Sequence, residues 1–264
     1  MKNTIAFAFL LIIGWTGFIA PTDFPSAKIT NGEIEAELYL PDANRGYYQG
    51  TRFDWAGVMP HLVYRKHSYF GIWNPAPYDP KLHDAIAGPV EEFVAVGMNE
   101  AEIGGEFLKI GVGSLIKPDA KPYSFNVPYQ IKNGGKWTVK KSIDKVEFTH
   151  VISDAAGYGY VYRKTVKLLS GKPEMVLEHS LKNTGQKLIE TQMYNHNFFM
   201  IDNEPTGPNI YTSFPYEIKA EGRGFGSIAK TENRAISYTK ELAPGDFVFT
   251  AGLQGFGPSP DDYD

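Results

Sequence analysis

The chain contains no cysteine among its 264 residues. Disulfide bonds, lipid attachment through a cysteine and thiolate metal sites are therefore excluded. A histidine-based metal site is not expected either, because His61 and His67 are loosely spaced and have no supporting carboxylates nearby. The absence of cysteine is compatible with an exported protein.

Basic residues do not cluster anywhere in the chain. The net charge is -4 and the isoelectric point is near 5.9, so neither nucleic acid nor an anionic membrane surface is favoured as a partner. The sequence also has no internal repeat and no long linker. Its length then predicts a single domain of the size usual for a large sandwich or barrel.

Signatures of several enzyme classes are missing as well. There is no G-x-S-x-G motif and no parallel α/β pattern, which disfavours a serine hydrolase. Gly111 and Gly113 are not followed by G-K-[ST], so they form no phosphate loop, and no cofactor is expected. The six arginines are widely scattered, which disfavours a sugar-phosphate epimerase that would gather them around the phosphate.

The N-terminus differs in character from the rest of the chain. Lys2 is followed by an uncharged run over residues 5–20, which is shorter than the roughly 20 apolar residues of a spanning helix and typical of a secretory signal. We predict a signal peptide or N-terminal anchor over residues 1–27 and a folded domain over 28–264. The protein is then expected to be periplasmic or secreted by a bacterium, with no stable membrane insertion beyond that segment. The sequence leaves the cleavage site and the oligomeric state open.

Alternation of apolar and polar residues dominates the remainder and predicts strands. We expect strands over residues 29–40 and 106–116, an antiparallel meander over 146–152, 158–169 and 175–183, and further strands over 211–220, 235–239 and 247–253. Residues 67–89 carry four prolines and form a loop, either an ordinary connection or a lid. No amphipathic helix follows the signal, so the predicted fold is all-β, a large antiparallel β-sandwich.

One stretch, residues 189–202, has an unusual composition for a core strand. On a strand, alternate side chains share a face, and one face here carries a polar and aromatic row around a histidine: Glu190, Gln192, Tyr194, His196, Phe198 and Met200. Such a row suits the wall of a sugar-binding cleft, although a hydrogen-bonded structural role for His196 is an equal alternative. His150 and His179 lie on apolar alternating faces and are interpreted as core residues.

Two neighbouring segments resemble the galactose mutarotase-like superfamily. The first is Glu174-Met-Val-Leu-Glu-His-Ser-Leu-Lys-Asn-Thr-Gly and the second is Tyr194-Asn-His-Asn-Phe-Phe. The similarity runs loosely over residues 31–255, and only positions 194–199 are specific. It implies a β-supersandwich whose concave sheet binds a mono- or oligosaccharide and interconverts its α and β anomers.

In the mechanism that this resemblance implies, a glutamate accepts the proton of the anomeric hydroxyl and a histidine protonates the ring oxygen. His196 would be that acid, and an imidazole with an ordinary pKa near 6.5 suits the role. The chain departs from the family at three places: residues 110–113 lack its second histidine, residues 88–93 lack its arginine, and the base glutamate would fall beyond residues 258–264. We therefore expect either a truncated product or a member without the standard chemistry.

Other side chains could replace the missing groups as ligands of sugar hydroxyls. Glu92, Lys109 and Asp202 are candidates, together with Gln192 and Tyr194 on the face of His196; the alternatives are solvated charges for Glu92 and Lys109 and a turn residue for Asp202. Two functions follow: an aldose 1-epimerase-like isomerase with His196 as general acid, or a non-catalytic carbohydrate-binding module. A structural envelope protein is a third reading.

Overall fold

The computed structural model describes residues 24–72, 78–250, 252–255 and 257. Most of the predicted signal peptide therefore lies outside the described residues. Ser26 and Ala27, which lie within the predicted signal peptide or anchor, belong to the first strand. Within the described residues, no helix is long and apolar enough to cross a membrane.

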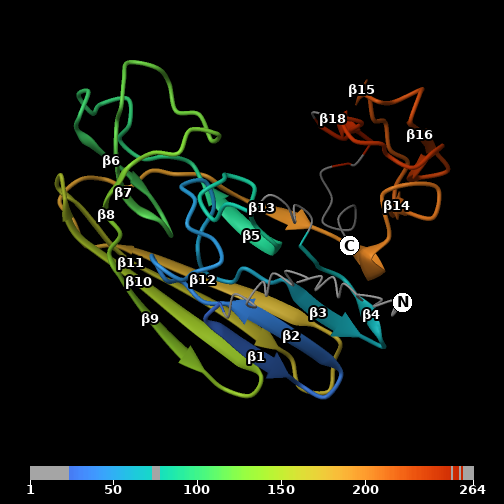
Figure 1. Cartoon of the computed structure of the whole chain (residues 1–264), viewed down its shortest axis with the longest axis horizontal. Helices are drawn as coiled ribbons and strands as arrows, with labels where there is room; N and C mark the ends of the chain where they lie inside the picture. The colour runs from blue at the N-terminus through green and yellow to red at the C-terminus, as the bar shows by residue number, and fades with distance from the viewer. Residues whose placement is uncertain (1–23, 73–77, 251, 256, 258–264) are drawn as a thin grey trace, which may run out of the picture.

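The protein is all-β, as predicted, and two four-stranded antiparallel sheets pack face to face (Figure 1). The first sheet contains β1 (Ser26–Thr30), β2 (Ile34–Tyr39), β3 (His61–Tyr64) and β4 (His67–Ser68). The second has the order β12-β11-β10-β9 and contains β9 (Lys136–Lys141), β10 (Lys145–Ala155), β11 (Tyr158–Leu168) and β12 (Met175–Asn183). The second sheet confirms the predicted meander.

Strict alternation on β10 and β11 builds the core between these sheets. Val146 and Phe148 on β10 point toward Ile29, Ile34 and Leu38 of the facing sheet, and all are buried. Each such side chain contributes about 1.5–3 kcal/mol when fully removed from water. The polar residues that intervene on β10 point to the opposite face. The pattern visible in the sequence thus fixes which face of the meander is buried.

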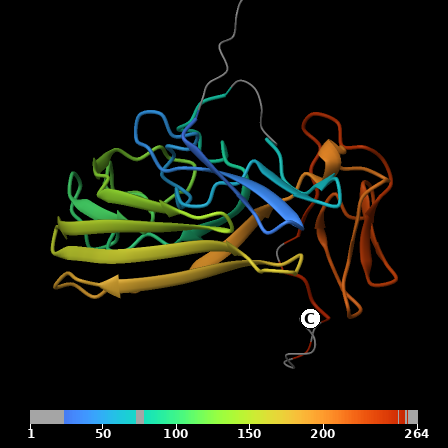
Figure 2. The same cartoon turned by 90° about the horizontal axis from the view of Figure 1, so that it is seen from below.

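The other end of the meander is covered by two smaller sheets (Figure 2). One is a ribbon of β5 (Gly88–Phe93) paired with β13 (Met193–Phe198), and the other contains β6 (Glu106–Lys109), β7 (Gly113–Ile116) and β8 (Ile131–Asn133). Phe93 of the ribbon packs edge-on against Tyr162 of β11, with ring centroids 5.5 Å apart. The ribbon is therefore seated on the inner face of the meander.

Two predicted strands are in fact hairpins. Residues 106–116 turn between β6 and β7 at Gly111, which has a φ of +77°, and residues 29–40 turn between β1 and β2 at Gly32, which has a φ of +87°. A Cβ at Gly111 would lie 2.3 Å from Oδ1 of Asp54. The chain reverses where glycine permits a left-handed backbone and a close approach, a signal that alternation alone does not carry.

The chain after β13 forms a lobe of short strands beside the sandwich (Figure 1). The 3-10 helix η1 (Ile201–Asn203) leads into this lobe. Its strands are β14 (Tyr211–Ser213), β15 (Gly222–Arg223), β16 (Ala229–Glu232), β17 (Ala235–Tyr238) and β18 (Phe249–Thr250). The expected strands over 211–220 and 247–253 are therefore present but shorter.

A charged network is buried where the β5–β13 ribbon meets the meander. Lys164 of β11 donates to the carboxylate of Glu91 and, at 2.9 Å, to the carbonyl of Ala56, and both charged side chains are 0 % exposed. The hydroxyl of Tyr162 donates to Oδ2 of Asp54 at 2.8 Å. Every charge in this network therefore has a partner, as burial requires.

The pKa values of the two carboxyl groups, Asp54 and Glu91, shift in opposite directions on folding. Burial raises the pKa of Asp54 to about 7, although Lys164 opposes the rise. Burial also acts to raise the pKa of Glu91, but Lys164 and His179 outweigh it and hold that pKa below its usual range. Asp54 therefore takes up a proton on folding near neutral pH, whereas Glu91 stays ionised.

This difference predicts a pH-dependent stability that Asp54→Asn removes. The pKa of Asp54 is higher in the folded than in the unfolded chain, so its contribution is present below the unfolded value of 3.8 and is lost as the pH rises toward about 7. Between pH values of about 5 and 7, the wild type should lose stability relative to Asp54→Asn by up to about 1.4 kcal/mol per pH unit. Denaturant unfolding at several pH values measures the difference.

His150 also makes stability depend on pH, so the wild type has to be compared with Asp54→Asn at each pH. Burial lowers the pKa of His150 to about 4, so its contribution to stability is lost as the pH falls and runs against that of Asp54. Because His150 is present in both proteins, its effect cancels in the difference. A difference in unfolding free energy that stays constant over this range would contradict the assignment to Asp54.

Candidate functional site

The pairing of β5 with β13 brings several predicted residues to one place. Tyr194 lies directly opposite Glu92, and His196 lies opposite Val90, and residues opposite each other on paired strands share a face. Arg52 and Lys109 reach the carboxylate of Glu92 from two other parts of the chain. We call the set Arg52, Glu92, Lys109, Tyr194 and His196 the Glu92 cluster.

The carboxylate of Glu92 is the centre of this cluster. Nε of Arg52 donates to Oε2 of Glu92 at 2.6 Å, and the hydroxyl of Tyr194 donates to the same oxygen at 2.5 Å. Arg52 also donates to the Tyr194 hydroxyl at 3.1 Å. Nζ of Lys109 lies 3.4 Å from the other oxygen, Oε1. Three donors therefore hold one carboxylate in place.

These contacts set the charge state of the cluster. Burial acts to raise the pKa of Glu92, but the hydrogen bonds from Arg52 and Tyr194 and the charge of Lys109 together lower it. Burial lowers the pKa of Lys109 to about 8, despite the opposing effect of Glu92. Glu92 is therefore an ionised carboxylate at neutral pH and a weak base.

Lys109 occupies a different position from the one expected of a ligand contact. Its side chain is 0 % exposed, and Nζ also donates to the carbonyl of Phe93. It lies 4.8 Å from the centroid of the Tyr123 ring. Lys109 therefore supports Glu92 from inside the core, while Tyr194, at 44 % exposure, presents the cluster to solvent.

His196 lies beside this network in an aromatic setting. Its ring stacks on Phe198 with centroids 3.9 Å apart and meets the edge of Phe53 at 5.7 Å. Burial lowers the pKa of His196 and the charge of Arg52 lowers it further, with Glu92 opposing. Across the described residues, neither ring nitrogen forms a hydrogen bond with another side chain or with the backbone. The half-buried imidazole is therefore neutral at pH 7 and has a nitrogen free to exchange a proton with a ligand.

Arg52 is the member of the cluster that the sequence did not reveal. Its guanidinium lies over the rings of Phe53 and Phe125, 4.4 Å and 4.1 Å from their centroids, which fixes its orientation. Residues 88–93 lack the arginine that the resemblance implies, and the cation that binds Glu92 comes from a segment 40 residues earlier in the chain. In the sequence, only the aromatic residues Tyr48 and Phe53 near Arg52 pointed to an ordered position for its side chain.

Asp202 and Gln192 stand apart from this network. Asp202 accepts hydrogen bonds from Nδ1 of His67 at 2.7 Å and from the backbone of Ser68 at 2.8 Å, and its φ is +51°. It therefore joins η1 to β4, in agreement with its interpretation as a turn residue. The side chain of Gln192 is exposed one residue before β13. The predicted strand over 189–202 shortens accordingly to β13.

The two histidines interpreted as core residues differ. His150 is buried, as predicted. His179 is not a core residue: its side chain is 22 % exposed, and Nε2 donates to Oε1 of Glu91 at 2.9 Å. Its strand, β12, lies at the edge of the meander, where the inner face is only partly covered.

Among the described residues, no group of three or more histidine, aspartate and glutamate side chains could hold a metal ion.

Comparison with protein-family models, with curated proteins and with solved structures found no match to the chain. A function for the chain is therefore inferred from the geometry of the Glu92 cluster.

The electrostatic coupling between Arg52 and His196 can be tested by nuclear magnetic resonance. We expect His196 to titrate below 6.5 and expect Arg52→Gln to raise its pKa, because a nearby cation is lost while Glu92 remains. The His196 signal is assigned by its disappearance in His196→Gln. Lys121→Gln, at an exposed site, should leave the titration unchanged. A pKa for His196 that is unchanged or lower in Arg52→Gln would refute the coupling.

Proposed function

We propose that the protein binds a mono- or oligosaccharide at the Glu92 cluster and opens the sugar ring by acid-base chemistry, as an aldose 1-epimerase-like isomerase. The observation that carries the proposal is the imidazole of His196, which has no hydrogen-bond partner among the described residues and lies beside an ordered arginine, carboxylate and phenol. Such convergent polar groups next to aromatic side chains are typical of sites that orient polyhydroxyl ligands. We further propose export to the periplasm or beyond the cell, on the pattern of residues 2–20.

In the proposed reaction, Arg52, Glu92 and Tyr194 orient the sugar through its hydroxyl groups. His196 gives a proton to the ring oxygen as the bond between that oxygen and the anomeric carbon breaks. The anomeric hydroxyl loses its proton to a base, and an open-chain aldehyde results. Rotation about the bond between C1 and C2 and reversal of both proton transfers give the other anomer.

The environment of His196 sets the pH dependence of this reaction. Because its pKa lies below 6.5, the imidazolium is a minor species at neutral pH but a stronger acid than usual. If proton donation to the ring oxygen limits the rate, kcat/KM should decrease as the pH rises above that pKa. A profile of mutarotation rate against pH reports the value.

A second candidate is a carbohydrate-binding module without turnover. The observation in its favour is the state of Glu92: a carboxylate held by Arg52, Tyr194 and Lys109, with a lowered pKa, is a weak base. Binding would then use the same cluster, and His196 would act as a hydrogen-bonding group. The two candidates differ in turnover and not in the site.

Polarimetry of freshly dissolved α-glucose and α-galactose tests the isomerase. The wild type should accelerate equilibration, and His196→Ala should reduce the acceleration by roughly 10²–10⁴-fold, the usual contribution of a general acid or base. His61→Ala is the matched control, because His61 is exposed on β3 and outside the cluster. Equal acceleration by the wild type and His196→Ala would remove the catalytic proposal.

Calorimetry against a panel of mono- and oligosaccharides tests the binding module. Binding without turnover, weakened at least about tenfold by Glu92→Gln or Tyr194→Phe, would support it. Circular dichroism of each variant confirms that the fold is kept. If the wild type neither binds nor converts any sugar of the panel, both candidates fail.

A further inference from the structure

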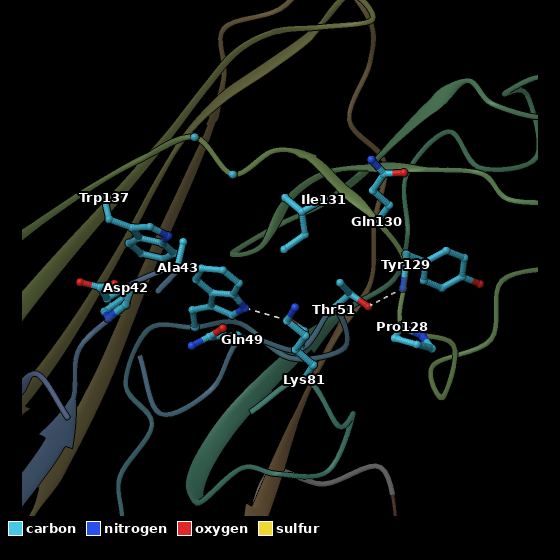
Figure 3. A pocket seen from close by; sticks show the side chains of 15 residues that line it. Asp42, Ala43, Gln49, Thr51, Lys81, Pro128, Tyr129, Gln130, Ile131 and Trp137 are labelled. Carbon is cyan, nitrogen blue, oxygen red and sulfur yellow. Dashed lines mark hydrogen bonds between the residues drawn. The ribbon is translucent and has the colours of Figure 1, made fainter. Parts of the chain in front are cut away.

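A recess lies away from the Glu92 cluster. It is a cavity of about 760 Å³, within the range of about 300–1,000 Å³ that is typical of small-molecule sites. Figure 3 shows Trp137 and Asp42 on one side of it and Thr51, Tyr129 and Pro128 on the other. No residue of the Glu92 cluster lines it. Thr51 and Arg52 are adjacent in the chain, so one segment contributes to both places.

The aromatic wall of this cavity is held in position from behind. The indole of Trp137 stacks on His150 with centroids 4.1 Å apart and planes 1° from parallel. Nε2 of His150 donates to the carbonyl of Gly134 at 2.9 Å, and the hydroxyl of Tyr160 donates to Nδ1 at 2.9 Å. Both ring nitrogens are therefore satisfied, and the lowered pKa keeps the imidazole neutral. The face of Trp137 is thus ordered before any ligand arrives.

The backbone next to Trp137, at Gly135, is also held in a defined conformation. Gly135 has a φ of +63°, and a Cβ there would lie 2.6 Å from Nε2 of His150. Its amide donates to the side chain of Asn133 at 2.9 Å. A glycine is therefore required for the chain to pass this close to the ring of His150, on which Trp137 stacks.

Amide, ammonium and carboxylate side chains line the rest of the cavity. Nε2 of Gln49 donates to the carbonyl of Gly46 at 3.1 Å, which orients the amide. Its oxygen accepts no hydrogen bond from the described residues. In the described part of the chain, the side chains of Lys81 and Gln130 are exposed and form no hydrogen bond or ion pair. The carboxylate of Asp42 accepts hydrogen bonds from the amides of residues 44 and 45 at 2.9 Å. The carboxylate of Asp42 is also paired with Arg45 at 3.7 Å, so Lys81 is the one unpaired charge among the described lining residues. A single cation is too little to select a polyanionic ligand.

We propose that this cavity is a second saccharide site, one for neutral oligosaccharides. Trp137 offers a flat aromatic surface to the apolar face of a pyranose, while Gln49, Gln130 and Lys81 bond its hydroxyl groups. A nucleotide would require several cations for its phosphates, and Lys81 is the one lysine or arginine in the lining. A lipid chain would leave these polar groups unpaired. The site binds and does not catalyse, and it is independent of the chemistry proposed for His196.

The test is a titration of the full chain with neutral cello-, malto- and xylo-hexasaccharides, followed by tryptophan fluorescence and calorimetry. At least one should bind to wild type, and binding should weaken about tenfold or more in Lys81→Ala/Gln130→Ala. Trp137→Phe, which keeps an aromatic ring against His150, should reduce both the affinity and the fluorescence change. A double variant of exposed residues elsewhere, Lys121→Ala/Gln186→Ala, is the matched control and should bind as wild type does.

His196→Ala separates this site from the Glu92 cluster. Hexasaccharide binding in the cavity should persist in His196→Ala, even where mutarotation is lost or was never present. Failure of all three hexasaccharides to bind would overturn the proposal, as would binding that Lys81→Ala/Gln130→Ala leaves unchanged. Binding restricted to an acidic polymer such as oligogalacturonate would overturn the assignment to neutral sugars.

Discussion

The ion pair between Lys164 and Glu91 is the interaction on which the arrangement of this molecule depends. Both side chains are fully buried, and the pair joins β5 to the inner face of the meander. Removal of one partner from such a pair leaves a buried charge uncompensated, at a typical cost of about 3–5 kcal/mol. The next residue on the strand, Glu92, points to the opposite face and forms the centre of the candidate site. Strand β5 is therefore held on the meander by Glu91, and its next residue, Glu92, lies in the candidate site.

Three histidines show how surroundings decide the use of a single residue type. His150 has both ring nitrogens bonded in the core and supports Trp137. His179 bonds Glu91 at the edge of the meander. His196 is held by aromatic rings and keeps its nitrogens free of bonds within the described residues. The burial of the ring and the partners of its nitrogens thus distinguish a structural imidazole from one suited to proton transfer.

The segment over residues 49–55 links the core and both proposed sites. Asp54 bonds Tyr162 in the core, and Arg52 holds Glu92. Thr51 lines the cavity, where its hydroxyl accepts a hydrogen bond from the backbone of Tyr129 at 3.3 Å. The backbone bends at residues 51–53 and 55, and successive side chains point in different directions. A short piece of chain can therefore fix two surfaces at once, provided that its own backbone is secured in the core.

The sequence by itself determined the β class, the meander, the absence of cysteine chemistry and the row that places Tyr194 and His196 on one face. These features depend on local alternation and composition, which neighbouring residues record directly. Only the tertiary structure decided that Arg52 joins Glu92 and Tyr194, from 40 and 142 residues away, that Lys109 is buried, and that Asp202 faces His67. Contacts between distant segments leave no periodic trace in a chain, because they arise from the packing of whole sheets and not from the order of adjacent side chains.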